Sequence, residues 1–436
     1  MKAIIPQSDL PRVVIIGGGF AGINLAKGLK NLPYQVVMID KHNYHTFQPL
    51  LYQVASGGLE PDSIAFPLRK VFAKQKNFSF RWAEVEQINP TEKCINTSIG
   101  TISYDYLVVA TGSTTNFFGN EQIEENAAGM KTIPESLDLR SIILQNFEHA
   151  HDYTDVEDQD KLMGFVAVGG GPTGVETAGA LAELKNHVLP KDYPELDLSL
   201  MDIHLVEAGD RLLKGMSEKS SKDALASLEK LGVHVHLNTL VTSFDGEKVK
   251  MKSGETIDAT TVIWAAGVKG ASVDGLENAI VPRGNRLKVD AFNQVEGYKD
   301  IFALGDIAFM QTEDYPHGHP MVAQVAIQMG KNLSKNLPLI QKGAPLKPFV
   351  YKDLGSMATI GRNKAVLDMG KLHLRGFLAW AGWMFVHILN LIGFRNKVVV
   401  FINWVWSYFT YDKATRLIIR PFKKKQKIES QEAAVN

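Results

Sequence analysis

Short apolar runs alternate with amphipathic segments along this chain, and the same order occurs twice. In the first copy, residues 12–16 are apolar and predict a buried parallel strand, 23–29 predict a helix, and 35–39 predict a second strand that ends at Asp40. In the second copy, 165–168, 175–184 and 203–206 repeat strand, helix and strand, and the last run ends at Glu207. The pattern therefore predicts two α/β units of the same design.

A glycine-rich turn joins strand to helix in each copy, at 17–22 and at 169–174. Gly17 can make the tight turn, Gly19 lets a pyrophosphate approach the backbone, and Gly22 lets helix and strand pack closely. The helix N-terminus offers free N–H groups and a positive dipole end to phosphates. Asp40 and Glu207 can accept hydrogen bonds from ribose hydroxyls. Two such turns predict two bound dinucleotides.

Later apolar runs indicate how the two units are connected. Residues 107–112 and 261–267 each predict a strand that ends at a glycine, and 300–306 predict a strand that ends in Gly-Asp. A helix at 321–333, opened by Pro320, follows. We therefore expect an α/β fold with two Rossmann-like dinucleotide-binding domains, the second inserted in the first, plus a C-terminal membrane-associated helical region. The expected boundaries are 1–116 with 284–341, then 117–283, then 342–436.

The C-terminal region contains two strongly apolar stretches, at 376–394 and 398–409, with four of the six tryptophans. Seven basic residues follow: Lys413, Arg416, Arg420, Lys423, Lys424, Lys425 and Lys427. Tryptophans and basic residues suit a membrane interface with anionic headgroups, so helices lying in the membrane surface are favoured. A spanning helix is the alternative, but polar residues argue against it: Arg375, His387, Asn390 and Arg395. A homodimer interface could use the same apolar surface.

The composition of the chain argues against several kinds of partner and site. The formal net charge is zero, which gives a nucleic-acid partner no global electrostatic support. The only cysteine, Cys94, allows no intrachain disulfide and no dithiol relay. The pairs His234/His236 and His317/His319 lack metal-ligand spacing and predict structural or solvent-facing roles, so no metal is expected. The N-terminus predicts neither a signal peptide nor a transit peptide, which favours the cytosol.

These motifs together resemble those of the two-dinucleotide-binding-domain flavoprotein reductases over 1–340. Within that superfamily the chain resembles the type II NADH dehydrogenases, because of HTFQPLLYQVA at 45–55, the second glycine turn followed by Val-Glu176, and AQVAIQ at 323–328. The resemblance implies FAD in the first unit and NADH in the second. The implied FAD contacts are Gly17, Gly19, Phe20, Ala21, Gly22, Asp40, Lys41, Gln48, Pro49, Val85, Ala110, Thr111, Gly112, Asp306, Ala323 and Gln324. The implied NADH contacts are Gly169, Gly171, Pro172, Thr173, Gly174, Glu176, Glu207, Ala266 and Gly267.

Three residues are the candidate catalytic groups. The resemblance places Glu176 near the nicotinamide, to orient NADH or tune proton chemistry, although its position early in a helix also suits a carboxylate that complements the helix N-terminus. Gln324 and Gln328 are four residues apart and share one helix face, and their amides can donate hydrogen bonds to quinone carbonyls.

Glu207 favours NADH over NADPH, because a 2′-phosphate would face a carboxylate. Arg211 is interpreted as a surface or ion-pairing residue.

The expected function is a non-proton-pumping NADH:quinone oxidoreductase, with hydride passing from NADH to FAD and two electrons to a membrane quinone, ubiquinone or menaquinone. The expected place is peripheral, on the cytoplasmic face of a bacterial inner membrane. Two alternatives stay open at this point: a cysteine-free ferredoxin or rubredoxin reductase, and an NADH-sensing flavoprotein.

Overall fold

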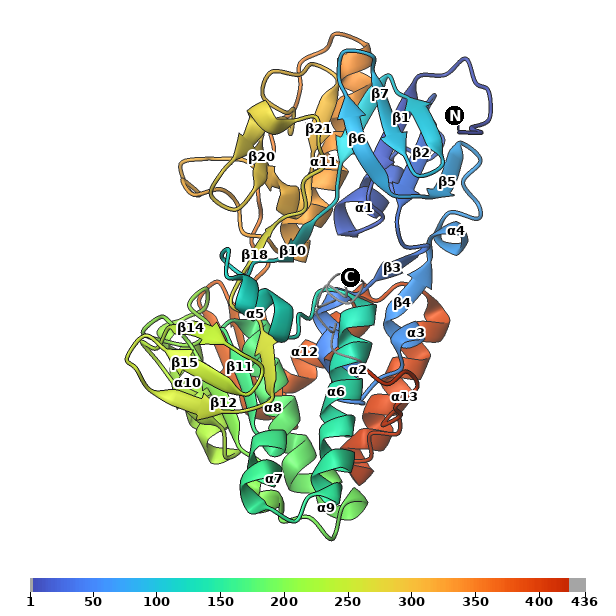
Figure 1. The fold of residues 1–436 in the computed structure, drawn as a ribbon. Coiled ribbons are helices and arrows are strands. Elements are labelled where there is room, and N and C mark those ends of the chain that lie inside the picture. The colour runs from blue at the N-terminus through green and yellow to red at the C-terminus, as the bar shows by residue number, and fades with distance from the viewer. Residues whose placement is uncertain (1–2, 423–436) are drawn as a thin grey trace, which may run out of the picture.

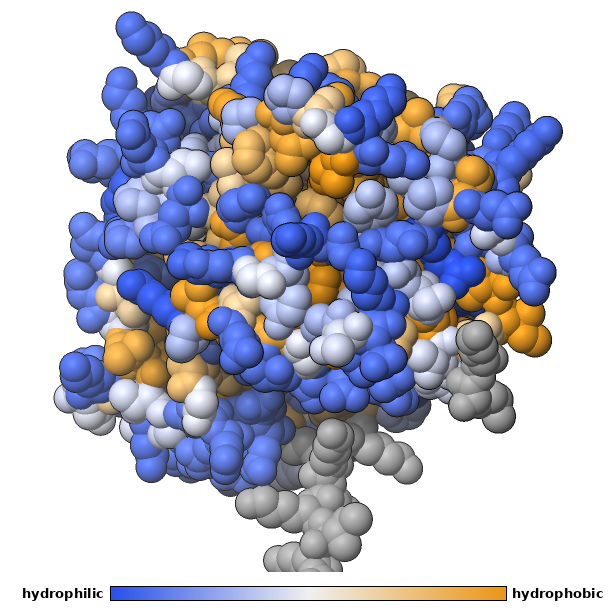
Figure 2. All heavy atoms as spheres, turned by 90° about the horizontal axis from the view of Figure 1, so that it is seen from above, coloured by the Kyte–Doolittle hydropathy of each residue, from blue (hydrophilic) through white to orange (hydrophobic). Residues whose placement is uncertain are grey.

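The computed structural model describes residues 3–422 and contains two α/β units, drawn one above the other in Figure 1, with a helical C-terminal region beside the second. The first unit holds the first glycine-rich turn and the second unit holds the other. Seen from the end of the first unit, hydrophilic side chains surround separate strips of apolar ones (Figure 2).

The first unit is built on a five-stranded parallel sheet in the order β21-β9-β1-β2-β5. Its strands are β1 (Arg12–Ile16), β2 (Gln35–Asp40), β5 (Phe78–Trp82), β9 (Tyr106–Val109) and β21 (Ile301–Ala303). The last strand comes after the whole second unit, so the chain returns to this sheet. Helices α1 (Phe20–Gly28) and α11 (Ala323–Gln341) pack against each other, and Gly330 of α11 leaves room for the backbone of Ala21.

The second unit is built on a four-stranded parallel sheet in the order β13-β12-β11-β17. Its strands are β11 (Phe165–Val168), β12 (Ile203–Val206), β13 (His234–His236) and β17 (Thr261–Trp264). Helices α8 (Pro172–Glu183) and α10 (Glu218–Lys230) belong to this unit. Each unit also carries a small antiparallel sheet, β6 (Val85–Asn89), β7 (Cys94–Thr97) and β8 (Gly100–Ser103) in the first, and β14 (Val241–Phe244), β15 (Lys248–Met251) and β16 (Thr256–Asp258) in the second.

The two units are joined by a two-stranded antiparallel ribbon of β10 (Ser113–Thr115) and β18 (Val268–Gly270), which Figure 1 shows between them. Helices α5 (Glu121–Asn126), α6 (Ile133–Asp152) and α7 (Val156–Met163) follow β10. Helix α6 begins with a capping box, in which Thr132 accepts from the backbone of Glu135 while the Glu135 side chain accepts from the backbone of Thr132.

The C-terminal region consists of a three-stranded antiparallel sheet and two helices. These are β23 (Ser356–Gly361), β24 (Lys364–Met369), β25 (Leu372–Arg375), α12 (Gly376–Asn390) and α13 (Phe394–Thr410). The apolar stretch 376–394 is interrupted at Gly393, which has a φ of +90°. Within residues 3–422, no helix has the length and apolar character needed to cross a membrane. Strand β23 packs directly on α8, since a Cβ at Gly179 would overlap the carbonyl oxygen of Ile360.

Short elements complete the chain. The strands are β3 (Tyr44–Thr46), β4 (Ala65–Pro67), β19 (Ile280–Val281), β20 (Arg286–Lys288) and β22 (Ala308–Phe309), and the helices are α2 (Leu51–Ala55), α3 (Pro61–Ile64), α4 (Leu68–Val71) and α9 (Leu189–Asp192). There are 3-10 turns at Gln48–Leu50, Leu198–Leu200, Glu277–Ala279 and Gly305–Ile307, and a π-helical turn at Leu184–Val188.

Three predicted helices have other bounds in the structure. The first dinucleotide helix, predicted at 23–29, spans Phe20–Gly28. The helix after Pro320, predicted at 321–333, begins at Ala323 and continues to Gln341, with Pro338 inside it. The second dinucleotide helix begins at Pro172 rather than at residue 175, because proline fits the first turn, where no backbone N–H is needed.

The buried apolar residues form one core per unit and a small third cluster. The second core extends beyond its own unit: it includes Phe47 and Leu51 from the segment after β2, and Trp383 and Val400 from the C-terminal helices. The segment 47–59 therefore packs between the second unit and the C-terminal region, although it belongs to the first half of the chain.

Candidate functional site

The first glycine-rich turn has the shape that a pyrophosphate requires. Gly17 has a φ of +108°, and a Cβ there would overlap the carbonyl oxygen of Ala110. A Cβ at Gly22 would overlap the carbonyl oxygen of Gly17, so α1 can approach β1 only with glycine at this position. At Gly19 a Cβ would meet nothing within 4 Å. The N-terminus of α1 therefore faces open space that a ligand can fill.

Asp40 closes this turn from the end of β2. One carboxylate oxygen accepts from the backbone N–H of Gly18 at 2.6 Å, and the other accepts from His42 N–H at 2.7 Å. Burial raises the pKa of Asp40, while these two hydrogen bonds oppose that rise. The carboxylate is thus fixed beside the turn, where a ribose hydroxyl of a bound dinucleotide could reach it.

Three further parts of the first unit converge on the same turn. Gly305 has a φ of +72° and lies against Ala21 of α1 and Ala326 of α11. The next residue, Asp306, accepts a hydrogen bond from Ser113 Oγ at 2.5 Å. Thr111 Oγ1 is buried with no hydrogen-bond partner among the described residues, and Gly112 (φ +73°) faces open space. An orphaned hydroxyl beside an open glycine cradle fits FAD, for which these residues were predicted.

The remaining predicted FAD contacts lie at the edges of this cradle. Phe20 opens α1 and packs against His45 and Phe47, Ala21 and Ala110 are buried, and Ala323 is the first residue of α11. Lys41 and Gln48 are exposed, Pro49 lies in the 3-10 turn after Gln48, and Val85 begins β6. His45 contributes another orphaned buried atom, Nε2, while its Nδ1 lies 3.1 Å from Gly18 O.

The second turn repeats the first. Gly169 has a φ of +114°, and a Cβ there would lie 2.6 Å from the carbonyl oxygen of Ala265. A Cβ at Gly174 would overlap Gly169 O, whereas one at Gly171 would meet nothing within 4 Å. The Glu207 carboxylate accepts from Gly170 N–H at 2.5 Å and from Gly209 N–H at 2.6 Å. The open N-terminus of α8 and the fixed carboxylate fit a second dinucleotide, predicted to be NADH.

The other predicted NADH residues lie along the same edge of the sheet. Pro172 and Thr173 are exposed in the first turn of α8, and Ala266 and Gly267 follow the end of β17. The Arg211 guanidinium donates to the carbonyl oxygens of Lys214 and Met216 and to Ser221 Oγ. These partners are neutral and no Arg211 ion pair occurs in the described part of the chain, so of the two predicted roles, surface residue or ion-pairing residue, the second is not seen.

Glu176 lies in the interior rather than at an exposed helix end. It is the fifth residue of α8, and 9% of its surface is exposed. One carboxylate oxygen accepts from the backbone N–H of Thr359 in β23 at 3.4 Å. Burial raises the pKa of Glu176 to about 8. The alternative role, a carboxylate that complements the N-terminus of its own helix, is therefore not the one that the structure gives it.

Gln324 and Gln328 do share a face of α11, and their amides bind one loop. Gln324 donates to Gly355 O at 2.8 Å and accepts from Leu354 N–H at 3.0 Å. Gln328 donates to Lys352 O at 2.9 Å and accepts from Lys352 N–H at 3.0 Å. The two amides hold the segment 351–355, which leads into β23. Their predicted role as direct quinone ligands stays a prediction.

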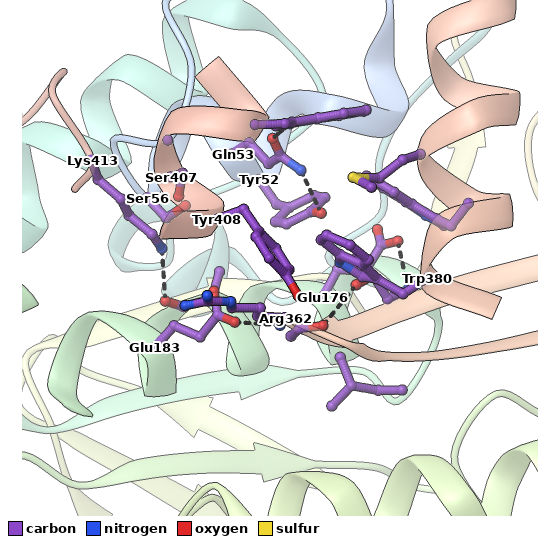
Figure 3. A pocket seen from close by; sticks show the side chains of 18 of the residues that line it. Tyr52, Gln53, Ser56, Glu176, Glu183, Arg362, Trp380, Ser407, Tyr408 and Lys413 are labelled. Carbon is purple, nitrogen blue, oxygen red and sulfur yellow. Dashed lines mark hydrogen bonds between the residues drawn. The ribbon is translucent and has the colours of Figure 1, made fainter. Parts of the chain in front are cut away.

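A cavity of about 110 Å³ lies between α8, β23 and the two C-terminal helices, with Glu176 in its wall (Figure 3). Its other polar side chains include Tyr52, Gln53, Ser56, Glu183, Thr359, Arg362, Ser407 and Lys413, and its aromatic wall comprises Trp380, Trp383, Trp404, Tyr408 and Tyr411. Of these residues, Glu176 was predicted from the sequence as a site residue, whereas the set as a whole was not. The signals were present, since Tyr52 and Gln53 lie in the 45–55 motif and three of the aromatic residues are tail tryptophans.

Lys413 corrects an expectation. It was grouped with the basic residues that face lipid headgroups, yet only 8% of its surface is exposed and its ammonium group points into the cavity. Nζ contacts Ala180 O at 3.3 Å. Burial lowers the pKa of Lys413, and the nearby Glu183 opposes this. Arg416 and Arg420 also have protein partners, Asp192 and Asp138. Lys423, Lys424, Lys425 and Lys427 lie outside the described residues.

An arginine forms one rim of the cavity. The Arg362 guanidinium lies over the rings of both Tyr408 and Tyr411, 4.3 Å and 4.1 Å from their centroids. The backbone N–H of Arg362 donates to Glu183 at 2.5 Å. This stack joins the end of β23 to the end of α13 and so fixes the cavity wall.

No cluster of three or more His, Cys, Asp or Glu side chains in residues 3–422 has the arrangement to hold a metal ion. His204, His234 and His236 stack along one edge of the second sheet, but they form no such cluster. His317 is exposed and His319 is buried, at 2% exposure, in a box of aromatic rings. Cys94 begins β7 and is half-buried, far along the chain from either glycine-rich turn.

Comparison with known proteins identifies families and individual proteins that are similar to this chain. Residues 11–330 match the family described as pyridine nucleotide-disulphide oxidoreductase, and 354–410 match the NDH2 C-terminal domain. The type II NADH:quinone oxidoreductase Ndh of Mycobacterium tuberculosis is 36% identical over 414 residues, which cover 92% of this chain and 88% of that protein. The type II NADH:quinone oxidoreductase of Haemophilus influenzae is 31% identical over 391 residues, covering 82% and 86%.

Solved structures show the same fold. The structure of NDH2 from Plasmodium falciparum in complex with NADH superposes with a TM-score of 0.85 at 22% identity, covering 94% of this chain and all of that one. The sulfide:quinone oxidoreductase of Aquifex aeolicus gives a TM-score of 0.71 at 21% identity, covering 92% and 95%.

Proposed function

Because this chain belongs to the type II NADH:quinone oxidoreductase family and is an enzyme of that activity, we propose that the quinone head group reacts in the Glu176 cavity. The family is FAD-dependent, and we place FAD at the Gly17–Gly22 turn and NADH at the Gly169–Gly174 turn. The domain boundaries 1–116 with 284–341, 117–283 and 342–436 go with this assignment. Bound FAD would carry two electrons between the two substrates. The residues described next act on the quinone.

The observation that carries the proposal is the buried carboxyl group of Glu176. The reaction NADH + H⁺ + quinone → NAD⁺ + quinol takes up one proton from solution. With its pKa raised to about 8, Glu176 is protonated at neutral pH and holds a proton inside the cavity. Quinone oxygens become basic as they gain electrons, so a proton donor at this position suits the reaction.

Two further side chains in the cavity can interact favourably with a quinone oxygen as it gains electrons. The Lys413 ammonium has a single long contact to a backbone carbonyl, so its positive charge can stabilise negative charge that develops on the quinone. The indole N–H of Trp383 is buried without a well-formed hydrogen bond, although its proximity to Glu176 opposes the rise of that residue's pKa. The carbonyl oxygens of a quinone bound in the cavity would offer acceptors to these donors.

The cavity is also placed for a lipid-soluble substrate. Its aromatic wall comes from α12 and α13, and the outer faces of the same helices expose large apolar side chains: Phe377, Leu378, Phe385, Leu389, Phe394, Phe401, Ile402, Trp406 and Phe409. Exposed apolar area on this scale marks an interaction surface. We propose that α12 and α13 lie in the membrane surface, on the cytoplasmic face, and admit ubiquinone or menaquinone from the bilayer.

We assign Gln324 and Gln328 a supporting role within this proposal. Their amides hold the segment 351–355, and β23 then runs from that segment to Thr359, the residue that binds Glu176. Helix α11 begins beside Gly305 and Asp306 of the FAD site, so it links that site to the start of β23. Family membership favours this function over a ferredoxin or rubredoxin reductase and over an NADH sensor.

Separate half-reactions test the proposal. Glu176→Gln removes the proton donor with little change of shape, and we expect slower reoxidation of the reduced enzyme by a short-chain quinone, with NADH-driven flavin reduction retained. Glu183→Gln is the matched control, because this carboxylate lines the same cavity but is bound to the Arg362 backbone. Equal effects of the two substitutions, or a normal quinone step in Glu176→Gln, would contradict the assignment.

A further inference from the structure

The turn between β10 and α5 contains an aromatic residue in an unfavourable conformation. Phe118 has a φ of +54°, and the next residue, Gly119, has a φ of +75°. Two consecutive left-handed residues suit Asn-Gly or Gly-Gly, and an aromatic residue at the first position is costly. Burial does not compensate, because 66% of Phe118 is exposed. A strained backbone that is not offset by stabilising side-chain packing is typical of residues that contact a ligand.

The turn is fixed to the second unit at the end of β17. The backbone N–H of Asn116 donates to Gly267 O at 3.0 Å, and Asn116 O accepts from the indole N–H of Trp264 at 2.8 Å. The Asn116 side chain accepts from Phe118 N–H at 2.9 Å. The ring is thereby held over Gly267: a Cβ added there would lie 3.0 Å from Phe118 Cζ. Its position depends on these bonds and not on apolar packing.

The strand order shows which part of a dinucleotide would reach this ring. The neighbouring strands β12, β11 and β17 end at Glu207, at Gly169 and at Ala265–Gly267. A dinucleotide with its adenosine ribose at Glu207 and its pyrophosphate at Gly171 extends along these carboxyl ends towards Gly267. The end that arrives beside Phe118 is the nicotinamide.

We propose that the exposed ring of Phe118 forms the outer wall of the nicotinamide subsite. This inference rests on the proposed binding of NADH at the second glycine-rich turn. The ring offers an apolar surface to the nicotinamide end and restricts its rotation, so that the reactive carbon faces the first unit. It also excludes water from one side of that end. Phe118 is thus a substrate-positioning residue supplied by the connection between the two units.

Phe118→Asn is the decisive variant, since asparagine suits the left-handed turn but removes the ring. We expect a Tm equal to or above that of the wild type and unchanged flavin content. The Kd for NAD⁺ in calorimetry, and the NADH concentration that gives half-maximal flavin reduction, should rise about 3- to 10-fold, the range of an aromatic contact. Reoxidation by quinone should not change, and Phe118→Tyr should stay close to wild type.

The outcomes separate this inference from its premise. Unchanged NAD⁺ and NADH binding in Phe118→Asn, while Glu207→Gln weakens it, would overturn the role of Phe118 alone. Unchanged binding in both variants would show that NADH does not use the second turn. A lower Tm with proportional losses in both half-reactions would assign Phe118 a structural role and overturn the inference.

Discussion

The carboxylate of Glu176 in α8 accepts a hydrogen bond from the backbone of Thr359 in β23, a residue 183 positions later in the chain. This contact joins the helix of the second glycine-rich turn to the first strand of the C-terminal region. It places a buried, protonated carboxyl group in the wall of the cavity that α12 and α13 complete.

The pH dependence of quinone reduction should report Glu176. Because its pKa is about 8 in the folded protein, the carboxyl group is protonated below that pH and loses its proton above it. The rate of flavin reoxidation by quinone should therefore be level near neutrality and fall above about pH 8. Rapid mixing across this range checks it, and Glu176→Gln should be slow without that fall. A wild-type rate that does not decline at alkaline pH would contradict this role.

Glu176 should also lower stability as the pH rises. The unfolded chain has the ordinary glutamate pKa of 4.5, so between that value and about 8 the folded state binds more protons than the unfolded state. The free energy of unfolding then decreases with pH through this window. Glu176→Gln should have a higher Tm than wild type, by an amount that grows from pH 5 to pH 8. If Glu176→Gln were less stable than the wild type by the same amount at every pH in this range, the prediction of a carboxyl group that stays protonated in the folded protein would be contradicted.

A pair of glycine substitutions separates ligand binding from folding in the second unit. Gly171 has an extended backbone (φ −74°, ψ 179°) and open space around it, so Gly171→Ala should keep its Tm and flavin but bind NADH more weakly. Gly174→Ala should lose stability, because its Cβ would overlap Gly169 O. Thermal melts and NAD⁺ calorimetry distinguish the two, and unimpaired nucleotide binding in Gly171→Ala would argue against this site.

Glu207 should control discrimination between the two nicotinamide cofactors. A 2′-phosphate would lie close to its fixed carboxylate, so Glu207→Gln should narrow the preference for NADH over NADPH by about tenfold, measured as the ratio of kcat/KM values. Arg211→Ala should leave that ratio unchanged and lower Tm, because its guanidinium holds the loop at 214–216. Loss of NADPH use in Arg211→Ala would show instead that this arginine meets a phosphate.

Membrane attachment should depend on the outer faces of α12 and α13. Leu389 and Phe401 are 55% and 56% exposed, and changing either to Asp should weaken binding to anionic lipid vesicles by about tenfold or more in a flotation assay. Val350→Asp, 79% exposed but outside both helices, is the matched control. Alkaline or high-salt washing should release the enzyme from membranes; resistance to both would contradict attachment at the surface.

The sequence predicted the parts of the fold that depend on local pattern. Strands β1, β11 and β12 have the predicted bounds. Gly17 and Gly169 have the positive φ of a tight turn, and Gly22 and Gly174 pack on the carbonyl oxygens of Gly17 and Gly169 within the same short segments. The two apolar stretches at 376–394 and 398–409 correspond to two helices, but the boundary between them was predicted too late, because α12 ends at Asn390 and α13 begins at Phe394, directly after Gly393.

The cavity could not be predicted in the same way. Its residues come from four distant segments, and nothing near Glu176 in the sequence indicates that β23 covers it. Lys413 follows an apolar helix and precedes other basic residues, which is also the pattern of a lipid-facing lysine. Its burial depends on contacts with α8, 233 positions earlier, where it reaches Ala180 O.

Double-mixing stopped-flow absorbance tests the central claim most directly, that a bound flavin passes electrons from NADH to a quinone held in the Glu176 cavity. NADH should bleach the flavin of the wild-type enzyme, and a short-chain quinone added second should restore its absorbance. In Lys413→Met, the first step should be retained and the second slowed about tenfold or more. Flavin that NADH does not bleach, or a Lys413→Met variant impaired only in the first step, would contradict the account.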